Sequence, residues 1–320
     1  AGQLRVEILA DKALYQGDSD ITVTVKVSNP AATSLSVPAW QLPSEDLPTP
    51  IVNLTAADGT PAPYTGPLVK WDMKAPAVTF APGASRVYKV ELTALYDIGN
   101  GRYRIDYSQD GPGKYDPSGR TARVFAPISP VYIETQGRSP RKQAVTLAPA
   151  PTVASLSTQR CTASQKSDIT TAVANATSYS QGANSYFSTN TVATTRYITW
   201  FGVANASRWA TAKDHFTSIT AAFTGQPVTV DCSCKKKTVY AYVYANQPYV
   251  IYVCGVFWTA PVTGTDSKAG TLIHEMSHFT VVAGTSDYVY GQSGAKSLAI
   301  SDPAKAVFNA DSHEYFAENT

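Results

Sequence analysis

The sequence predicts two domains of different fold class, an all-β, immunoglobulin-like sandwich over residues 1–137 and an α+β domain over residues 158–320. The first prediction rests on short runs of alternating apolar and polar residues that are separated by Pro and Gly. The second rests on helical spacing of apolar residues, followed by a few strand-like runs and further helical spacing. Residues 138–157, rich in Pro, Ala, Ser and Thr, are predicted to form an exposed linker.

The N-terminal domain is expected to contain about seven or eight antiparallel strands, the pattern of a sandwich. Its clearest strand is "ITVTVKVSN" (21–29), in which apolar side chains alternate with polar ones and so define one buried face. Further runs of this kind are "LRVEIL", "SLSVPAW", "RVYKVEL", "RYRIDYS", "ARVFA" and "VYIET". Because these runs bring together no nucleophile, base or metal ligand, we expect this domain to serve in binding, folding assistance or inhibition.

The C-terminal domain is expected to combine helices with a small sheet. "DITTAVANATSYS" and "VANASRWATAKDHFTSITAAF" have helical spacing, and "PVTVDCSC", "TVYAYVYA" and "YVIYVCG" have the composition of strands. Helices followed by a small sheet and further helices indicate an α+β fold. His215, on the second helix, has no partner in the sequence and is interpreted as a surface or core histidine.

Composition argues against several classes of function. A chain of 320 residues with 43% hydrophobic and 16% charged residues is typical of an ordered globular protein. The net charge of +2 and the single basic run, Lys235 to Lys237, argue against a nucleic-acid partner. No run approaches the ~18 apolar residues that a membrane-spanning helix needs. Because the chain starts at Ala1 without an apolar leader, we expect an exported protein whose signal peptide has been removed.

The cysteines indicate an oxidising, extracellular compartment. Cys161, Cys232, Cys234 and Cys254 form an even set confined to one region, which predicts two disulfides. A structural zinc site is disfavoured because Cys161 stands alone, and because one residue rather than two separates Cys232 from Cys234. Those two neighbours are too close to bond to each other, so two pairings remain open.

The segment "HEMSH" (274–278) has the spacing of a zinc site. It is predicted to lie on a helix that is capped by Asp266 or Ser267 and runs until Gly284. His274 and His278 are then one turn apart and can both bind one zinc ion, while Glu275 is placed to take a proton from the attacking water.

The identity of the third zinc ligand decides the class of site, and the residues alone leave three kinds of candidate. His313 is the one downstream histidine, but it lacks the Gly-turn spacing of a metzincin. Glu314 or Glu318 would be a glutamate on a later helix. Asp287 follows a Gly-Thr turn that would fold the chain back toward the helix.

"HEMSHF" followed by "GTSDYVYG" resembles the deuterolysin-type aspzincin metallopeptidases, whose combined pattern is HExxH with GTxDxxYG. The resemblance extends through "NADSHEYFAEN" and the cysteine spacing, and covers approximately residues 158–320. It implies a zincin-like endopeptidase domain that holds one zinc ion, with Asp287 as the third ligand beside His274 and His278. It also implies two disulfides, Cys161–Cys232 and Cys234–Cys254.

Further residues are expected to act on the substrate, which would be a protein or peptide. Tyr290, three residues beyond Asp287, is expected to turn its hydroxyl toward the metal and to stabilise the developing oxyanion. Asp311 and Glu314 match the acidic positions that bind lysine in the peptidyl-Lys branch of the family. Because they are three residues apart on a helix, both can face one cavity, and hydrolysis before lysine is implied.

The strand-rich N-terminal part is similar to the pro-domain of a toxic extracellular member of the family, which implies a zymogen. The pro-domain would be an intramolecular partner, as chaperone or inhibitor, and one of its lysines, not identifiable from the sequence, would bind Asp311 and Glu314. A cut between Arg141 and Lys142, the single lysine of the linker, would release the pro-domain by autocatalysis.

Two other functions are compatible with the residues. One is a secreted β-sandwich binding protein whose zinc is structural. The other is a zinc protease of a different clan, with Glu314 or Glu318 as the third ligand.

Overall fold

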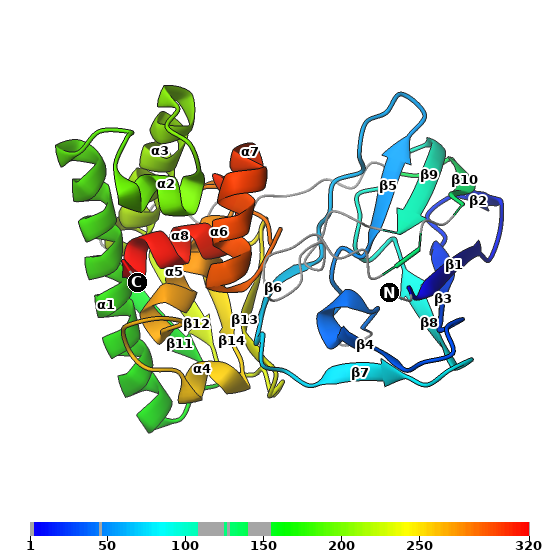
Figure 1. Ribbon diagram of the computed structural model, residues 1–320, viewed down its shortest axis with the longest axis horizontal. Helices are drawn as coiled ribbons and strands as arrows, with labels where there is room; N and C mark the ends of the chain where they lie inside the picture. Colours follow the sequence, from blue (N-terminus) through cyan, green and yellow to red (C-terminus); the bar gives the residue numbers. More distant parts are fainter. Residues whose placement is uncertain (1–2, 45–46, 108–124, 127–128, 140–154, 320) are drawn as a thin grey trace. The chain divides into compact units, whose positions relative to one another are not determined.

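The computed structural model describes residues 3–44, 47–107, 125–126, 129–139 and 155–319 (Figure 1). They divide into two compact units. The first takes in the described residues up to Pro67 and from Ala75 to 139, and the second takes in Leu68–Lys74 and the described residues from 155 onward. The expectation of an uninterrupted N-terminal domain over residues 1–137 is therefore corrected at Leu68–Lys74, which belongs to the second unit.

The described part of the first unit is all-β. Its strands form sheets of three, four and two strands. In chain order the elements are β1 (Arg5–Ala10), β2 (Leu14–Gln16), β3 (Thr22–Ser28), β4 (Leu35–Pro38), the 3-10 helix η1 (Ala39–Gln41), β5 (Val52–Ala56), β7 (Ala77–Phe80), β8 (Ser85–Glu91), β9 (Gly101–Tyr107) and β10 (Val131–Gln136). The sheet orders are β1-β3-β8, β2-β10-β9-β5 and β4-β7.

Alternation along the strands builds one core for these sheets. In β3, Val23, Val25 and Val27 are fully buried, as the period-two pattern predicts. A single hydrophobic cluster contains side chains from each described strand of this unit, which is how packed sheets bury their inner faces. One pairing, β2 with β10, is parallel rather than antiparallel. The immunoglobulin-like connection of the strands stays a prediction.

The second unit contains a five-stranded sheet in the order β11-β12-β14-β13-β6. Its strands are β11 (Ser155–Gln159), β12 (Pro227–Asp231), β14 (Val250–Val253), β13 (Val239–Tyr244) and β6 (Pro67–Trp71). The three strands β11, β12 and β14 are parallel, and β13 is antiparallel to β14. The expected linker thus ends earlier than residue 157, because β11 begins at Ser155.

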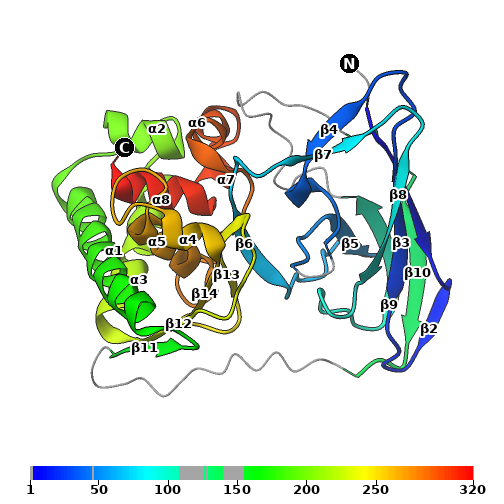
Figure 2. The ribbon, with the colours of Figure 1, turned by 90° about the horizontal axis from the view of Figure 1, so that it is seen from below.

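Helices of the second unit pack around this sheet. They are α1 (Ala163–Thr189), α2 (Thr195–Phe201), α3 (Ala206–Gly225), α4 (Gly255–Thr259), α5 (Lys268–His278), α6 (Gly291–Ser301), α7 (Pro303–Ala306) and α8 (Ala310–Glu318). Figure 2 shows α1 and α3 side by side, and α5 contacts α1, α8 and β13. Helix α5 is fully buried along its length, so its side chains lie in the interior of this unit.

Both disulfides lie in the second unit and join the pairs that the family resemblance implies. Cys161–Cys232 links the ends of β11 and β12, and Cys234–Cys254 closes the segment that contains β13 and β14. Among the described residues, no helix is both long and apolar enough to cross a bilayer.

Candidate active site

Helix α5 carries the two histidines, and its start is held by a buried network. The side chain of Ser267 accepts a hydrogen bond from the backbone N–H of Gly270 at 2.8 Å, which caps the helix. Glu318 on α8 in turn accepts hydrogen bonds from the backbone N–H and the hydroxyl of Ser267, at 2.9 and 2.7 Å. The position of α5 therefore depends on α8.

The helix ends at His278, six residues before the predicted stop at Gly284. Three β-branched residues, Thr280 to Val282, follow Phe279 and disfavour continuation of the helix. Gly284 has φ 58 and turns the chain, after which the N–H of Thr285 donates to the carbonyl of Ser277. This return brings the loop that contains Asp287 beside the end of α5.

His274 and His278 present their Nε2 atoms to one point. The two Nε2 atoms are 3.1 Å apart and the ring planes are 86° to each other. His278 Nδ1 lies 2.9 Å from the carbonyl oxygen of Thr285, which can only accept, so Nδ1 carries the proton and Nε2 has a free lone pair. This is the tautomer that a metal ligand needs.

Asp287 completes a triangle of ligand atoms. Its Oδ1 lies 3.1 Å from His274 Nε2 and 3.4 Å from His278 Nε2. Ligand atoms at 2.0–2.1 Å from a tetrahedral zinc ion are about 3.3 Å from one another, so the triangle fits zinc. Burial opposes ionisation of Asp287, but the adjacent histidines outweigh it and lower its pKa. Its Oδ1 is buried and makes no regular hydrogen bond within the described residues.

Glu275 lies beside this triangle. A carboxylate oxygen of Glu275 and ring nitrogens of His274 and His278 all lie within 4.8 Å of one another. Neither carboxylate oxygen has a hydrogen-bond partner in the described part of the chain. Burial, together with the charges of Asp287 and Glu314, raises the pKa of Glu275 well above its usual range. A buried carboxyl group of raised pKa next to a metal position is suited to exchange a proton.

The other candidates for the third ligand are bound elsewhere. His313 Nε2 lies 3.0 Å from His215 Nδ1, and His313 Nδ1 lies 2.9 Å from the carbonyl oxygen of Asn309. Burial lowers the pKa of His313 to about 3 and that of His215 to about 4, so both are neutral core residues. Glu318 caps α5. Glu314 also lies near His274, in a second group of potential metal ligands that includes Asp311, but this group holds an ammonium instead.

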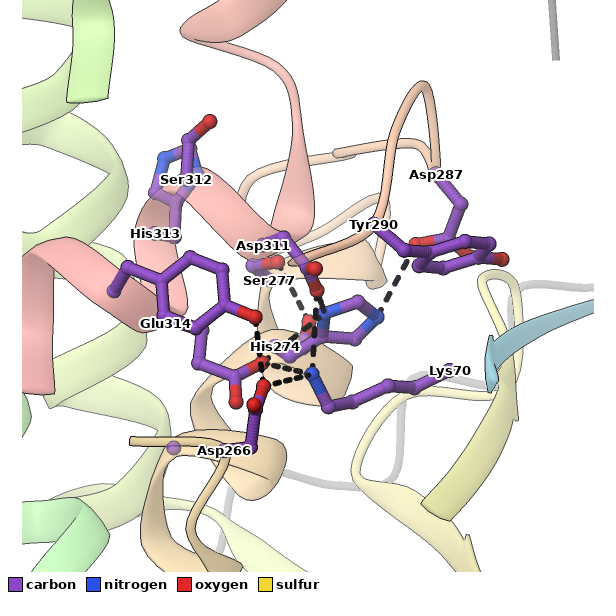
Figure 3. A network of polar contacts seen from close by, with 12 residues as sticks. Lys70, Asp266, His274, Ser277, Asp287, Tyr290, Asp311, Ser312, His313 and Glu314 are labelled. Carbon is purple, nitrogen blue, oxygen red and sulfur yellow. Dashed lines mark hydrogen bonds and ion pairs between the residues drawn. The ribbon is translucent and has the colours of Figure 1, made fainter. Parts of the chain in front are cut away.

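That ammonium belongs to Lys70 on β6 (Figure 3). Its Nζ lies 2.6 Å from Glu314 Oε2, 3.3 Å from Asp311 Oδ1 and 3.9 Å from Asp266 Oδ1. We call these three acidic residues the acidic cluster. Lys70 is only 2% exposed, and Asp311 and Glu314 are 1% and 0% exposed. Burial alone would lower the pKa of Lys70, but the acidic cluster raises it well above its usual range, so the lysine is charged.

Aromatic rings and backbone groups support this ion cluster. The Lys70 ammonium lies 5.1 Å from the centre of the Tyr240 ring, a distance that permits a cation–π interaction. Asp311 Oδ2 accepts the N–H of Gly291 at 2.6 Å. Asp311 Oδ1 is also 2.7 Å from His274 Nδ1, although not in regular hydrogen-bond geometry. Asp311 thus links His274, a candidate metal ligand, to the site that binds the ammonium.

Tyr290 contacts the same segment as the acidic cluster. Its hydroxyl donates a hydrogen bond of 2.6 Å to the carbonyl oxygen of Val69, the residue before Lys70. Tyr290 directly precedes α6, three residues after Asp287, so one loop carries a candidate metal ligand and a hydroxyl that binds a carbonyl oxygen.

Comparison with known proteins shows the family of the chain. The family model described as lysine-specific metallo-endopeptidase matches residues 186–318. An "Extracellular protease" of Aeromonas hydrophila is 40% identical over 319 residues, which cover 96% of this chain and 90% of the relative. The chain belongs to the aspzincin family. A "Peptidyl-Lys metalloendopeptidase" of Armillaria mellea is 36% identical to this aspzincin over 320 residues, which cover 94% of this chain and 87% of the relative.

A solved zinc peptidase from Grifola frondosa is 51% identical to this aspzincin and covers 50% of the chain and 97% of its own, with a TM-score of 0.48. The family model and the Armillaria relative confirm the predicted class of enzyme: this aspzincin is a metalloendopeptidase.

Sequence reasoning missed three partners of the site, Val69, Lys70 and Asp266. It assigned "PLVKW" (67–71) to no strand, because the run lacks polar and apolar alternation. A short apolar run that contains one lysine is a usable signal, since a buried strand with a single charge must place that charge on a partner. The predicted processing residues Arg141 and Lys142 lie outside the described residues, as does most of the predicted strand "ARVFA".

Proposed function

We propose that the chain is the zymogen of a secreted zinc endopeptidase that cuts proteins on the amino-terminal side of lysine. One observation carries the proposal: the acidic cluster holds the ammonium of Lys70 while Tyr290 holds the carbonyl that precedes this lysine in the chain. A peptide cut before lysine has to present these two groups in this order. The printed name of the Armillaria relative, a peptidyl-Lys metalloendopeptidase, supports the same specificity.

His274, His278 and Asp287 hold one zinc ion in this proposal. When bound there, zinc would act as a Lewis acid on the carbonyl and would lower the pKa of water, so that water can be deprotonated for attack near neutral pH. Glu275 accepts the proton of the attacking water and delivers it to the amine that leaves. Neither of its carboxylate oxygens has a hydrogen-bond partner among the described residues, so both can take part in these transfers. No covalent intermediate with the chain is formed, because Glu275 acts on water rather than on the substrate.

Tyr290 stabilises the carbonyl oxygen as negative charge develops on it. The hydroxyl already donates to a carbonyl oxygen at 2.6 Å, within the range of an O–H···O hydrogen bond. A donor at this position interacts more strongly with an oxyanion than with a neutral carbonyl, and therefore lowers the barrier to hydrolysis.

The acidic cluster sets the preference for lysine. A neutral side chain in the place of Lys70 would leave Asp311 and Glu314 buried without a cation, a penalty of about 2–5 kcal/mol in comparable cases. Lysine delivers a compact charge at the end of a flexible stem, which suits convergent carboxylates, whereas arginine presents a wide planar fork.

The first unit serves as the pro-domain in this proposal, built as an immunoglobulin-like sandwich and acting as chaperone or inhibitor. Two disulfides in the second unit favour an oxidising compartment, and the Aeromonas relative is named an extracellular protease. Protein and peptide substrates are the expected partners, without nucleic acid or membrane. Autocatalytic removal of the pro-domain follows from the single lysine of the linker, Lys142.

Digestion of a mixed peptide library by the zinc-loaded, self-processed protein tests this function. Products should begin with lysine. In the double variant Asp311→Asn, Glu314→Gln the preference for lysine over alanine should fall by at least about tenfold, because the buried charges that favour it are gone. The matched control is Asp214→Asn, which removes an exposed carboxylate from α3. Products that begin mainly with apolar residues would refute the assignment.

A further inference from the structure

The segment Leu68–Lys74 is an isolated piece of chain within the second unit. Strand β6 is at the end of the sheet order, next to β13, and both ends of the segment continue into residues of the first unit, at Pro67 and Ala75. An edge strand presents unpaired backbone groups, and an extended peptide is the usual ligand of such an edge. The segment therefore has the form of a peptide that has been added to the sheet.

Lys70 behaves as the ligand of a preformed cation site. Its ammonium meets three carboxylates that come from the loop before α5 and from α8, 196, 241 and 244 residues further along the chain. Burying one unpaired charge is very costly, whereas here the lysine and both buried carboxylates satisfy each other. Removal of Lys70 would leave these carboxylates without a cation.

Val69 adds the second feature of a bound substrate. Its carbonyl oxygen accepts the hydroxyl of Tyr290, which shares a loop with Asp287. The peptide bond that follows this carbonyl is the bond to Lys70. The segment thus offers, in consecutive residues, a carbonyl at the catalytic hydroxyl and a lysine at the acidic cluster.

We propose that Leu68–Lys74 binds to the active site as a tethered analogue of the substrate, and that Lys70 is the residue that keeps peptide substrates out. The inference rests on the proposed function, because it assigns the Lys70 site to the residue that follows the cut. It names the inhibitory residue, which neither the family assignment nor the sequence identifies.

Tethering explains why such an inhibitor is effective. A segment held at both ends has an effective concentration on the order of millimolar at its site. For a segment that binds the open site with a dissociation constant of about 10–100 micromolar, the affinity of a competing peptide falls by about 10- to 100-fold, because the peptide must displace the segment first. A cut elsewhere in the chain that frees the segment would remove this competition.

Binding of peptides to the intact chain, rather than hydrolysis, tests the inference. The catalytically inactive variant Glu275→Gln prevents processing, and the probe is a fluorescent octapeptide with one internal lysine, compared with its alanine analogue. Adding Lys70→Met should strengthen binding of the lysine peptide by about 10- to 100-fold. Lys74→Met is the matched control, since Lys74 lies in the same segment but is exposed, and it should leave binding unchanged.

Hydrogen exchange in the Glu275→Gln protein provides a second measurement, which does not depend on the folding of a Lys70 variant. Excess lysine peptide should increase exchange of the amides of residues 68–74, and the alanine peptide should not. Equal affinity of the parent and the Lys70→Met protein, with the preference for lysine retained, would reject the tethered inhibitor but keep the proposed function. If neither protein prefers the lysine peptide, both proposals fall.

Discussion

Four buried carboxyl groups, Glu275, Asp287, Asp311 and Glu314, lie in and around one site. Buried carboxylates need compensating positive charge. Lys70 provides this positive charge for Asp311 and Glu314. A zinc ion would provide it for Asp287 and for Glu275, which lies beside the metal position. This division of charge explains why Asp287, and not Glu314, suits the metal.

Zinc stoichiometry of two alanine variants tests this division. Asp287→Ala removes one of three ligands and should lower zinc affinity by more than about 100-fold, since loss of even an outer partner costs about 10- to 100-fold. Glu314→Ala should retain zinc, because that carboxylate holds Lys70. Metal analysis after dialysis against a weak chelator measures both. Retention of zinc in Asp287→Ala and loss of zinc in Glu314→Ala would show that Glu314, and not Asp287, is the third zinc ligand.

Helices α5 and α8 pack so closely that one position of α5 has room for glycine but not for a larger residue. Gly270 lies in the first turn of α5, and a Cβ atom there would overlap Glu318 Oε1 and lie 3.0 Å from Glu314 Cγ. Glycine is otherwise unfavourable inside a helix, by up to about 1 kcal/mol relative to alanine. Close packing, rather than helix propensity, therefore accounts for this glycine.

Alanine at two helical glycines should change stability in opposite directions. Gly270→Ala should lower the free energy of unfolding by about 1–3 kcal/mol, because the added methyl group displaces Glu318. Gly182→Ala, in α1, should raise it by up to about 1 kcal/mol, because a Cβ there meets nothing within 4 Å. Denaturant titration of the zinc-loaded proteins measures both changes. Stabilisation by both substitutions would show that the two helices can separate at no cost.

The contact between α8 and the start of α5 also predicts a dependence on pH. Burial, with the nearby charge of Glu314, raises the pKa of Glu318 to about 8 from its usual value of 4.5. Between these values the folded protein holds a proton that the unfolded chain has released. The contribution of Glu318 to stability is therefore complete below about pH 4.5, declines as pH rises, and is lost above about pH 8.

Glu318→Gln should remove this decline, because glutamine cannot ionise but can still accept a hydrogen bond from Ser267. The Tm of the variant should rise relative to that of the parent from pH 5 to pH 8, because its free energy of unfolding gains at most about 1.4 kcal/mol per pH unit over that of the parent. Parallel melting curves of the two proteins across this range would contradict the assigned pKa.

At the scale of the whole molecule, the order of the chain couples the two units. Residues 68–74 belong to the second unit although residues on both sides of them belong to the first. A single cut in the linker would leave residues 68–74 covalently attached to the first unit. We therefore expect that maturation withdraws the inhibitory lysine together with the pro-domain.

Incubation of the purified full-length chain with zinc tests autocatalytic maturation. The wild-type protein should yield a fragment that starts at or near Lys142, because this is the one lysine of residues 138–157. Glu275→Gln should remain full length under the same conditions. Intact mass and N-terminal sequencing identify the products. Equal processing of both proteins, in the absence of other proteases, would exclude autocatalysis.

Local patterns in the sequence were sufficient to predict that His274, His278 and Asp287 lie close together. The spacing of His274 and His278 places them one turn apart on any helix, and the motif around Asp287 implies the third ligand without knowledge of distances. The alternation in β3 and the helical stripe of α3 likewise predict their buried faces. These features follow from short-range periodicity, which the sequence contains directly.

Contacts between distant residues were decided by the tertiary structure. Lys70 and its partners in α8 are more than 240 residues apart, and nothing in the local pattern of "PLVKW" shows that its strand joins the sheet of the other unit. The pairing of His215 with His313 was hidden for the same reason. Helix α5 ends at His278 because the following loop returns to Ser277. Periodicity reveals which face of an element is buried, whereas the partner that buries it is chosen by packing of the whole chain.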